Sequence, residues 1–157
     1  MTTQDEKVRE FLQGRYIAAL GTENQDGTIH LTAVWYLFED GNLFVSTSSA
    51  SRKARNVAAR PRVCMMIDSR KPGSERGAST SGAAEIMTSQ QSQDLNSRIF
   101  SRYLSEAAIA DPRVGPVLAS MDDVTIRITP ESWTWWDTSV LFGGLLSQTP
   151  GYVLPLD

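Results

Sequence analysis

Short runs of apolar and β-branched residues, separated by polar turns, dominate the first third of the chain. Residues 16–22 form a compact apolar segment, residues 28–38 are rich in β-branched and aromatic side chains, and residues 43–47 repeat that character. The connections at residues 24–27 and 39–42 each contain Asp-Gly, which is a strong signal for a hairpin turn. We therefore expect three strands here, arranged as an antiparallel meander.

The rest of the chain predicts further strands with less regular spacing. Residues 62–68 are almost continuously apolar, which favours a strand buried on both faces. The Gly- and Ser-rich residues 69–81 are expected to form a loop. Additional strands are predicted at residues 82–88, 124–128 and 133–136.

Helical periodicity appears in three places. Residues 5–13 and 90–104 carry apolar side chains at helical spacing and predict an N-terminal helix and a main helix. Ser51 is a suitable N-cap for a short helix over residues 52–60, which Pro61 would end. Residues 111–121 are expected to form a turn followed at most by a short helical segment.

These elements together favour a mainly β fold with helices, of the α+β class, in which short strands close into a barrel or sandwich. The length of 157 residues fits one domain. Within residues 1–157 we expect an N-terminal helix in residues 1–14, the barrel and its helices in residues 15–137, and a C-terminal tail in residues 138–157. The tail is apolar, so it is expected to pack on a surface of its own chain or of a partner.

Charge and composition limit the function. With 15 basic and 18 acidic residues, the net charge is −3. This charge does not indicate the excess of basic residues that typically binds nucleic acid or an anionic membrane. The first ten residues lack the apolar segment of a signal peptide, and no apolar run approaches the roughly 20 residues of a membrane span. We therefore expect a cytoplasmic protein that contacts neither nucleic acid nor a membrane.

Few side chains suggest covalent or metal chemistry. Cys64 is the single cysteine and is expected to be a small buried hydrophobe, and with His30 as the single histidine no metal site is expected. No nucleophile with an attendant base is apparent, so we expect no catalytic side chain. The indoles of Trp133, Trp135 and Trp136 are expected to pack in the core or at a dimer interface, and the alternative is that one of these rings stacks near a cofactor.

One stretch suggests an anion site. Residues 46–53 place five hydroxyl side chains, a helix start and two cations within eight positions. The backbone N–H groups and the dipole of a helix N-terminus favour an anion, hydroxyls donate to its oxygens, and Arg52 and Lys53 supply charge. These residues are suited to a phosphate, and a capped, solvated helix start is the alternative.

The order of these features resembles a known superfamily. The run ALGTENQDGTIHLTAVWYLFEDGNLFVSTSSASRKARNVAARPRVCMMID is similar to the core of the pyridoxamine-phosphate-oxidase-like split-barrel proteins, which bind flavins. The resemblance covers about residues 8–88 and continues more loosely through residues 82–85 and Arg102-Tyr103.

This resemblance implies a six-stranded antiparallel split β-barrel that works as a homodimer, with FMN or the deazaflavin coenzyme F-420 bound at the interface. Arg52 and Lys53 would hold the cofactor phosphate, and strand residues near position 34 would run along its ring through their backbone groups. Trp135 or Trp136 would come from the other subunit and close the ring pocket. The supporting hydroxyls would be those of Ser46, Thr47 and Ser51, and the strand residues would be Thr32, Ala33, Val34, Trp35 and Tyr36.

Two departures argue against oxidation of a B6 vitamer. The strand position that is basic in true pyridoxamine-phosphate oxidases is Thr32, and no Arg or His follows Trp133. We therefore expect an oxidoreductase that moves hydride to or from a small molecule, with a reduced nicotinamide among the candidate partners. The alternatives are a coenzyme F-420-dependent reductase and a non-enzymatic carrier or sensor of flavin, deazaflavin or haem, in which His30 would be the haem ligand.

Overall fold

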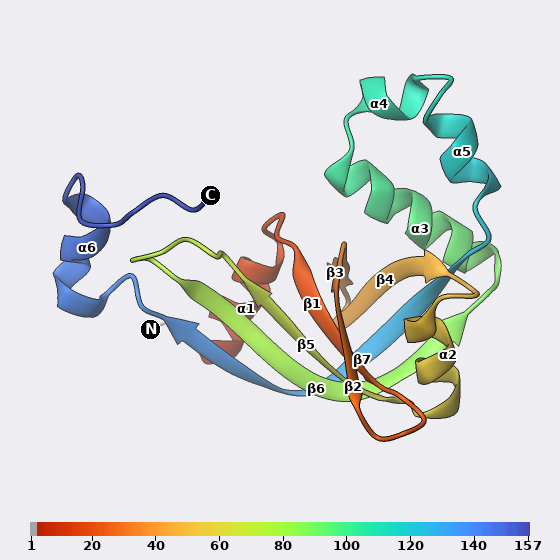
Figure 1. Cartoon of the computed structure of the whole chain (residues 1–157), viewed down its shortest axis with the longest axis horizontal. Helices are drawn as coiled ribbons and strands as arrows, with labels where there is room; N and C mark the ends of the chain where they lie inside the picture. Colours follow the sequence, from red (N-terminus) through yellow and green to blue (C-terminus); the bar gives the residue numbers. More distant parts are fainter. Residues whose placement is uncertain (1–2) are drawn as a thin grey trace.

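A computed structural model describes residues 3–157 and contains one curled antiparallel sheet, with some helices packed against it and others projecting from its two ends (Figure 1). In that part of the chain the sheet has seven strands, where the resemblance implied six. The strands are β1 (Ala18–Glu23), β2 (Ile29–Val34), β3 (Leu37–Glu39), β4 (Asn42–Ser48), β5 (Arg62–Asp68), β6 (Arg76–Met87) and β7 (Asp123–Asp137).

The strand order brings the two edges of the sheet together. The order is β2-β1-β5-β6-β7-β4-β3, so β2 and β3 lie at opposite edges although they are neighbours in the chain. Only Trp35 and Tyr36 connect Val34 to Leu37, and three peptide steps span at most about 11 Å. The sheet must therefore curl until its edges nearly meet, which produces a split barrel.

The prediction of a single strand over residues 28–38 was wrong, and this break supplies the seventh strand. Tyr36 turns into the interior, where it is fully buried and its hydroxyl donates to the carbonyl oxygens of Leu12 at 3.1 Å and Gly14 at 2.9 Å. Trp35 packs instead against the main helix. The two aromatic side chains are anchored to different helices, which interrupts the strand between them.

The predicted loop over residues 69–81 was also wrong beyond position 75. Arg76–Met87 forms the long strand β6, which pairs with β5 on one side and β7 on the other. Its small residues leave room for large neighbours, since a Cβ on Gly77 would lie 2.2 Å from the Trp136 ring. The small, polar residues that suggested a loop therefore belong to a strand. They are small because large side chains of the neighbouring strand lie over them.

The two strands predicted at residues 124–128 and 133–136 are one strand, β7. Ser81 pairs with Ser132 but Gly82 pairs with Pro130, so Glu131 is an extra residue on β7. This bulge accommodates Pro130, which lacks the N–H that a regular ladder needs. The proline therefore bends the strand without ending it.

The helices agree with the sequence pattern in position and differ at their ends. Ser51 caps the short helix as predicted, while residues 111–121 contain a short helix that is preceded by another. The predicted irregular tail contains two further short helical segments, and residues 1 and 2 of the predicted N-terminal segment lie outside the described residues. The helices are α1 (Gln4–Leu12), α2 (Arg52–Ala59), α3 (Gln90–Tyr103), α4 (Glu106–Ala110), α5 (Gly115–Ser120), η1 (Leu141–Gly144) and α6 (Leu145–Gln148).

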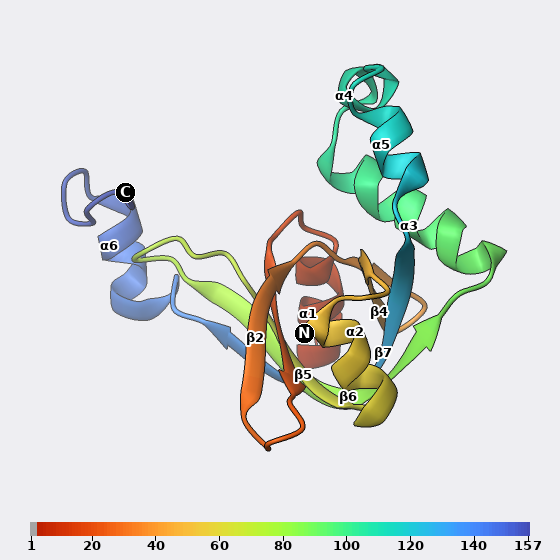
Figure 2. The same ribbon diagram turned by 45° about the vertical axis from the view of Figure 1, so that its right-hand side comes forward.

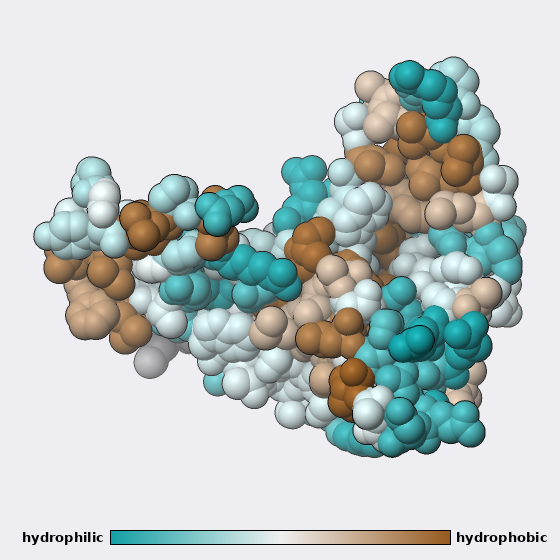
Figure 3. Space-filling model, viewed as in Figure 1, coloured by the Kyte–Doolittle hydropathy of each residue, from teal (hydrophilic) through white to brown (hydrophobic). Residues whose placement is uncertain are grey.

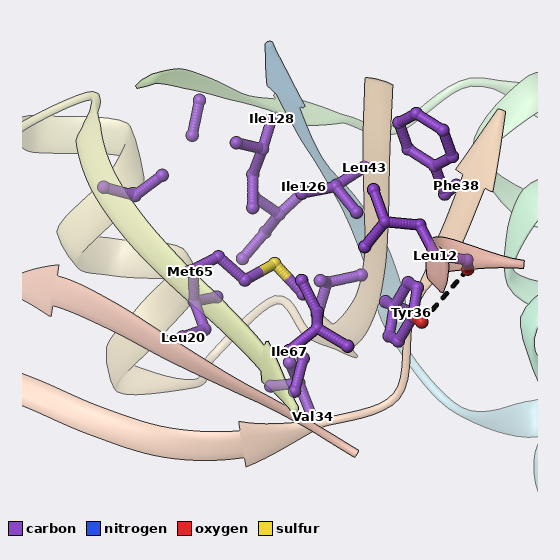
Figure 4. Close-up of a cluster of buried hydrophobic side chains, with 14 of the residues drawn as sticks. Leu12, Leu20, Val34, Tyr36, Phe38, Leu43, Met65, Ile67, Ile126 and Ile128 are labelled. Carbon is purple, nitrogen blue, oxygen red and sulfur yellow. Dashed lines mark hydrogen bonds between the residues drawn. The ribbon is translucent and has the colours of Figure 1, made fainter. Parts of the chain in front are cut away.

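The core fills the inside of the curled sheet and is closed by α1 (Figure 4). Leu12 of α1 lies beside Tyr36 and Leu43, and Met65 and Ile67 of β5 face them from across the barrel. Further apolar side chains come from β1, β4 and β7. As Figure 2 shows, α3, α4 and α5 form a lobe at one end of the sheet, whereas η1 and α6 lie at the other end.

Cys64 is exposed, which corrects the prediction that it is buried. Along β5, Val63, Met65 and Ile67 point into the barrel while Cys64 and Met66 point outward. The continuous apolar run suggested burial on both faces, but within one chain nothing covers the outer face of this strand in residues 3–157.

Candidate functional site

The predicted anion site lies where β4 runs into α2. The chain turns through residues 48–51, and the Ser51 hydroxyl accepts a hydrogen bond from the Ala54 N–H at 3.2 Å. The first N–H groups of a helix have no partner within the helix, so those of Arg52 and Lys53 are directed out of its N-terminus. This end of α2 therefore carries a partial positive charge.

Three of the predicted side chains form one hydrogen-bonded network. The Lys53 ammonium donates to the Thr47 hydroxyl at 3.2 Å, and the Thr47 hydroxyl donates to that of Ser51 at 3.0 Å. Lys53 is half-buried, and burial lowers its pKa below the ordinary value for lysine. A bound anion would offset this cost, because it would supply the negative partner that the half-buried ammonium lacks among residues 3–157.

Lys53 also lines a cavity of about 360 Å³ at the split of the barrel. This volume lies within the range of small-ligand sites. The cavity lies between the end of β2, the end of β4 and the face of α3, and most of its walls are apolar or aromatic. Its lining residues are Ile17, Ala33, Val34, Trp35, Ser46, Lys53, Ile99 and Phe100.

The cavity thus gathers Ala33, Val34, Trp35, Ser46 and Lys53 from the predicted site. A cationic, hydroxyl-rich end and an aromatic wall suit a molecule that has a phosphate and a flat ring. The donor set therefore fits a flavin or deazaflavin phosphate.

Other predicted residues lie outside this cavity. Arg52 is exposed at the start of α2, and the Thr32 side chain points to the inner face of β2. The Tyr36 side chain is buried in the core, and its backbone N–H donates to the Tyr103 hydroxyl at 3.4 Å. Trp136 lies over Gly77, four strands away from β2, which is about 19 Å along the sheet.

Sequence reasoning missed four residues of the site. Ile17, Ile99 and Phe100 line the cavity. In the sequence, Ile99 and Phe100 are marked only by their helical spacing, and the same spacing is expected of residues that pack in a core. Asp123 accepts a hydrogen bond from Ser46 at 3.3 Å. Burial raises the pKa of Asp123, so a group that holds its proton more firmly than usual lies beside the cavity.

The end of α3 ties this region to α1. The Arg102 guanidinium donates to the carbonyl oxygens of Leu12 at 3.3 Å and Gln13 at 2.9 Å, and also to that of Gly14. A cation at the C-terminus of a helix stabilises the negative end of its dipole. Arg102 therefore fixes α1 against α3, which forms one wall of the cavity.

Residues 3–157 bring together no group of three or more His, Cys, Asp or Glu side chains that could hold a metal ion. No helix in this part of the chain has both the length and the apolar character of a membrane-spanning helix.

Comparison with solved structures gives the same architecture. A conserved hypothetical protein from Mycobacterium tuberculosis is 27% identical over 88% of this chain and 86% of its own, with a TM-score of 0.70. An F-420 reductase is 25% identical over 80% of this chain and 94% of its own, with a TM-score of 0.62. The haem storage protein HutZ from Vibrio cholerae is 17% identical over 87% of this chain and 95% of its own, with a TM-score of 0.64.

Sequence comparison identifies the family. No curated protein matches the sequence. The profile of the pyridoxamine 5'-phosphate oxidase family, however, matches residues 4–137, which span both the barrel and the candidate site. The chain therefore belongs to the pyridoxamine 5'-phosphate oxidase family.

Proposed function

We propose that this protein is an oxidoreductase that binds FMN in the cavity at the split of the barrel and transfers hydride to or from a small molecule. The observation that carries the proposal is the position of Lys53. Its ammonium lies at the positive end of α2 and lines the same cavity as Trp35, so one site offers both a phosphate partner and a flat wall for a ring.

The residues of this chain would bind and orient the cofactor. Lys53, the α2 N–H groups and the hydroxyls of Thr47 and Ser51 would hold the phosphate, while Ala33, Val34 and Trp35 would lie along the ring. Ile99 and Phe100 would exclude water from the other side. The bound cofactor would supply the hydride chemistry, so no side chain needs to act as acid or base.

Coenzyme F-420 is the second candidate, and the likeness to an F-420 reductase supports it. The deazaflavin has the same ring-and-phosphate frame, so the cavity suits both cofactors. The haem-storage neighbour supports a third candidate, a haem carrier. However, the only imidazole, His30, lies on the inner face of β2 opposite Thr22 and does not line the cavity.

We further propose that the protein is a homodimer that pairs through the outer face of the sheet. Two adjacent rows of cross-strand neighbours on this face contain no charged side chain. One row is Leu31, Gly21, Cys64, Ser81 and Ser132, and the other is Ala33, Ala19, Met66, Ser79 and Thr134. Glu23 and Arg62 lie in the next row and provide a charged rim, so the face has the layout of a protein interface.

The first experiment is an absorption spectrum of the purified protein, followed by separate titrations with FMN, coenzyme F-420 and haem. We expect tight binding of FMN, and in Lys53→Gln a loss of about 1.5–3 kcal/mol of binding free energy, the scale of a hydrogen bond to a charged group. The matched control is Lys7→Gln on the exposed face of α1, which should bind as the wild type does.

The other outcomes separate the candidates. Binding of coenzyme F-420 alone would identify a deazaflavin reductase. Binding of haem alone, with a Soret band that is lost in His30→Ala, would identify a haem protein. A folded protein that binds none of the three, or equal affinity in the wild type and Lys53→Gln, would overturn the proposed site.

A further inference from the structure

A second cavity, the lobe cavity, lies in the lobe that α3, α4 and α5 form at one end of the sheet. Its volume is about 530 Å³, and it is lined by α3, the end of α5 and the segment from Met121 into β7. Figure 3 shows the lobe as a projection from the sheet, with apolar side chains gathered on the face seen there. Among residues 3–157 only Phe100 lines both this cavity and the cofactor cavity, so the two share a wall and remain separate sites.

The lobe cavity is acidic. Asp94, Asp122 and Asp123 line it, whereas no Lys, Arg or His among residues 3–157 does, and none of the three carboxylates forms an ion pair in that part of the chain. Their hydrogen-bond donors are the neutral side chains of Gln90, Ser49 and Ser46, respectively. Burial raises the pKa of Asp123, and the neighbouring Asp122 carboxylate adds to that rise. A positively charged occupant would relieve both the burial cost and the repulsion between carboxylates.

Asn96 presents a fixed hydrogen-bond donor to this cavity. It lines the cavity but is only 5% exposed. Its Oδ1 accepts a hydrogen bond from the Thr125 hydroxyl at 2.7 Å, and the Ser92 hydroxyl lies 2.8 Å from that of Thr125. The Asn96 Nδ2 makes no hydrogen bond within residues 3–157 and keeps access to the cavity. Because a buried amide without an acceptor is costly, the occupant is expected to carry an oxygen that accepts from Nδ2.

The carboxylates are spread around the cavity and do not converge on one point. Within residues 3–157 no three His, Cys, Asp or Glu side chains are grouped so that they could hold a metal ion. The rest of the wall includes the apolar side chains of Phe100, Leu118, Met121 and Val124. A hydrocarbon chain with separate positive groups suits this arrangement, because its methylene groups gain from apolar contact and an aromatic ring also attracts a cation.

We propose that the lobe cavity binds a small organic dication that also carries a carbonyl or hydroxyl oxygen, such as an acylated polyamine. Its ammonium groups pair with the aspartates, and its oxygen accepts a hydrogen bond from the Asn96 Nδ2. The same negative charge repels compounds that carry phosphate groups. This site goes beyond the proposed cofactor function and does not depend on it.

The test is an isothermal titration of the full chain, without added cofactor, with monoacetylspermidine, which has two ammonium groups and one carbonyl oxygen. We expect saturable binding. Asp94→Asn and Asp122→Asn keep an oxygen for the existing donors, and each should weaken binding about two- to fivefold, the range for ion pairs open to solvent. The double variant should weaken it about tenfold. The matched control is Glu106→Gln on α4, a carboxylate of the same lobe that does not line the cavity and should bind as the wild type does.

A second measurement follows the Asn96 side-chain amide by NMR in the wild type. Its resonance should shift as monoacetylspermidine saturates the protein, while that of Asn42, outside the cavity, should stay in place. Absence of binding, an unmoved Asn96 resonance, or equal affinity in the wild type and the double variant would overturn the proposal. Displacement of the polyamine by an equal concentration of Mg²⁺ would also overturn it, because it would show a general attraction of cations. The FMN affinity of the double variant should equal that of the wild type, so these failures leave the cofactor site untouched.

Discussion

The rings of Trp35 and Tyr103 lie parallel, with centroids 4.9 Å apart and planes inclined by 8°. Trp35 is the residue at which β2 leaves the sheet, and Tyr103 is the last residue of α3. The Tyr103 hydroxyl donates to the Tyr16 carbonyl oxygen at 2.7 Å. The last residue of α3 therefore holds the aromatic wall of the cavity in place, although it does not line the cavity itself.

This relationship predicts different effects for two substitutions of Tyr103. Tyr103→Phe keeps the stacked ring and removes both hydrogen bonds of the hydroxyl, those with the Tyr36 N–H and the Tyr16 carbonyl oxygen, so we expect a loss of about 1–3 kcal/mol in unfolding free energy and unchanged cofactor affinity. Tyr103→Ala also removes the stacking, worth about 0.5–1.5 kcal/mol, and should weaken cofactor binding about two- to tenfold. Urea unfolding and fluorescence titration measure the two effects, and equal cofactor affinity in both variants would contradict the positioning role.

The buried phenol of Tyr36 predicts a loss of stability in alkali. Burial raises the pKa of Tyr36 above the value of 10.0 that the side chain has in the unfolded chain. Above that pH the unfolded state releases the proton and the folded state keeps it, so the free energy of unfolding falls by as much as about 1.4 kcal/mol per pH unit. Below it, this contribution to stability is fully present.

Tyr36→Phe should lack this dependence. It loses the hydrogen bonds to Leu12 and Gly14, which costs about 1 kcal/mol at neutral pH because Arg102 still donates to both carbonyl oxygens. Urea unfolding at several pH values on both sides of 10 provides the measurement. Parallel pH profiles for the wild type and Tyr36→Phe would show that another group governs the alkaline range.

The elements with local signals could be predicted from the sequence, and those that depend on tertiary contacts could not. The Asp-Gly turns and the Ser51 cap act through nearby backbone atoms, and both predictions hold. By contrast, Trp35 and Tyr36 extend an apolar, β-branched pattern without interruption. The break between β2 and β3 exists because these side chains pack against two helices that are distant in sequence.

The same reasoning applies to the candidate site. Lys53, Thr47 and Ser51 lie within seven residues, so sequence alone grouped them, and the structure joins them by hydrogen bonds. Ile99 and Phe100 reach the cavity from a helix 46 or more residues away, and their spacing is equally that of an ordinary core helix. Only the fold distinguishes those two roles.

Gly82 provides a test of the bulge in β7. A Cβ at this position would lie 2.1 Å from the carbonyl oxygen of Thr129, a backbone atom that cannot move without shifting the strand. We expect Gly82→Ala to destabilise the protein by about 1–3 kcal/mol, the usual cost of overpacking. Ala83→Ser, at the neighbouring exposed position, is the control and should unfold like the wild type in urea, whereas equal stability of Gly82→Ala would contradict the tight contact.

The lowered pKa of Lys53 predicts how cofactor binding depends on pH. In the free protein burial lowers this pKa, and a bound phosphate would raise it again, so the complex holds the proton at a pH where the free protein has begun to lose it. The affinity for the cofactor is then greatest at pH values below the lowered pKa of Lys53 in the free protein. It falls as the pH rises above that value, and it stops falling once the pH exceeds the pKa of Lys53 in the complex. Phosphate itself is almost fully ionised above about pH 8 and adds no further change there.

Lys53→Arg separates this effect from general alkaline damage, because a guanidinium stays charged throughout the range. We expect the variant to bind the cofactor with an affinity that stays level from neutral pH to about pH 10, where unfolding linked to Tyr36 begins. The wild type should lose affinity toward the alkaline end of the same interval in isothermal titrations, where Lys53 of the free protein gives up its proton before an ordinary lysine would. If both proteins lose affinity in parallel, the phosphate is not held by Lys53, and the exposed Arg52 becomes the residue to replace next.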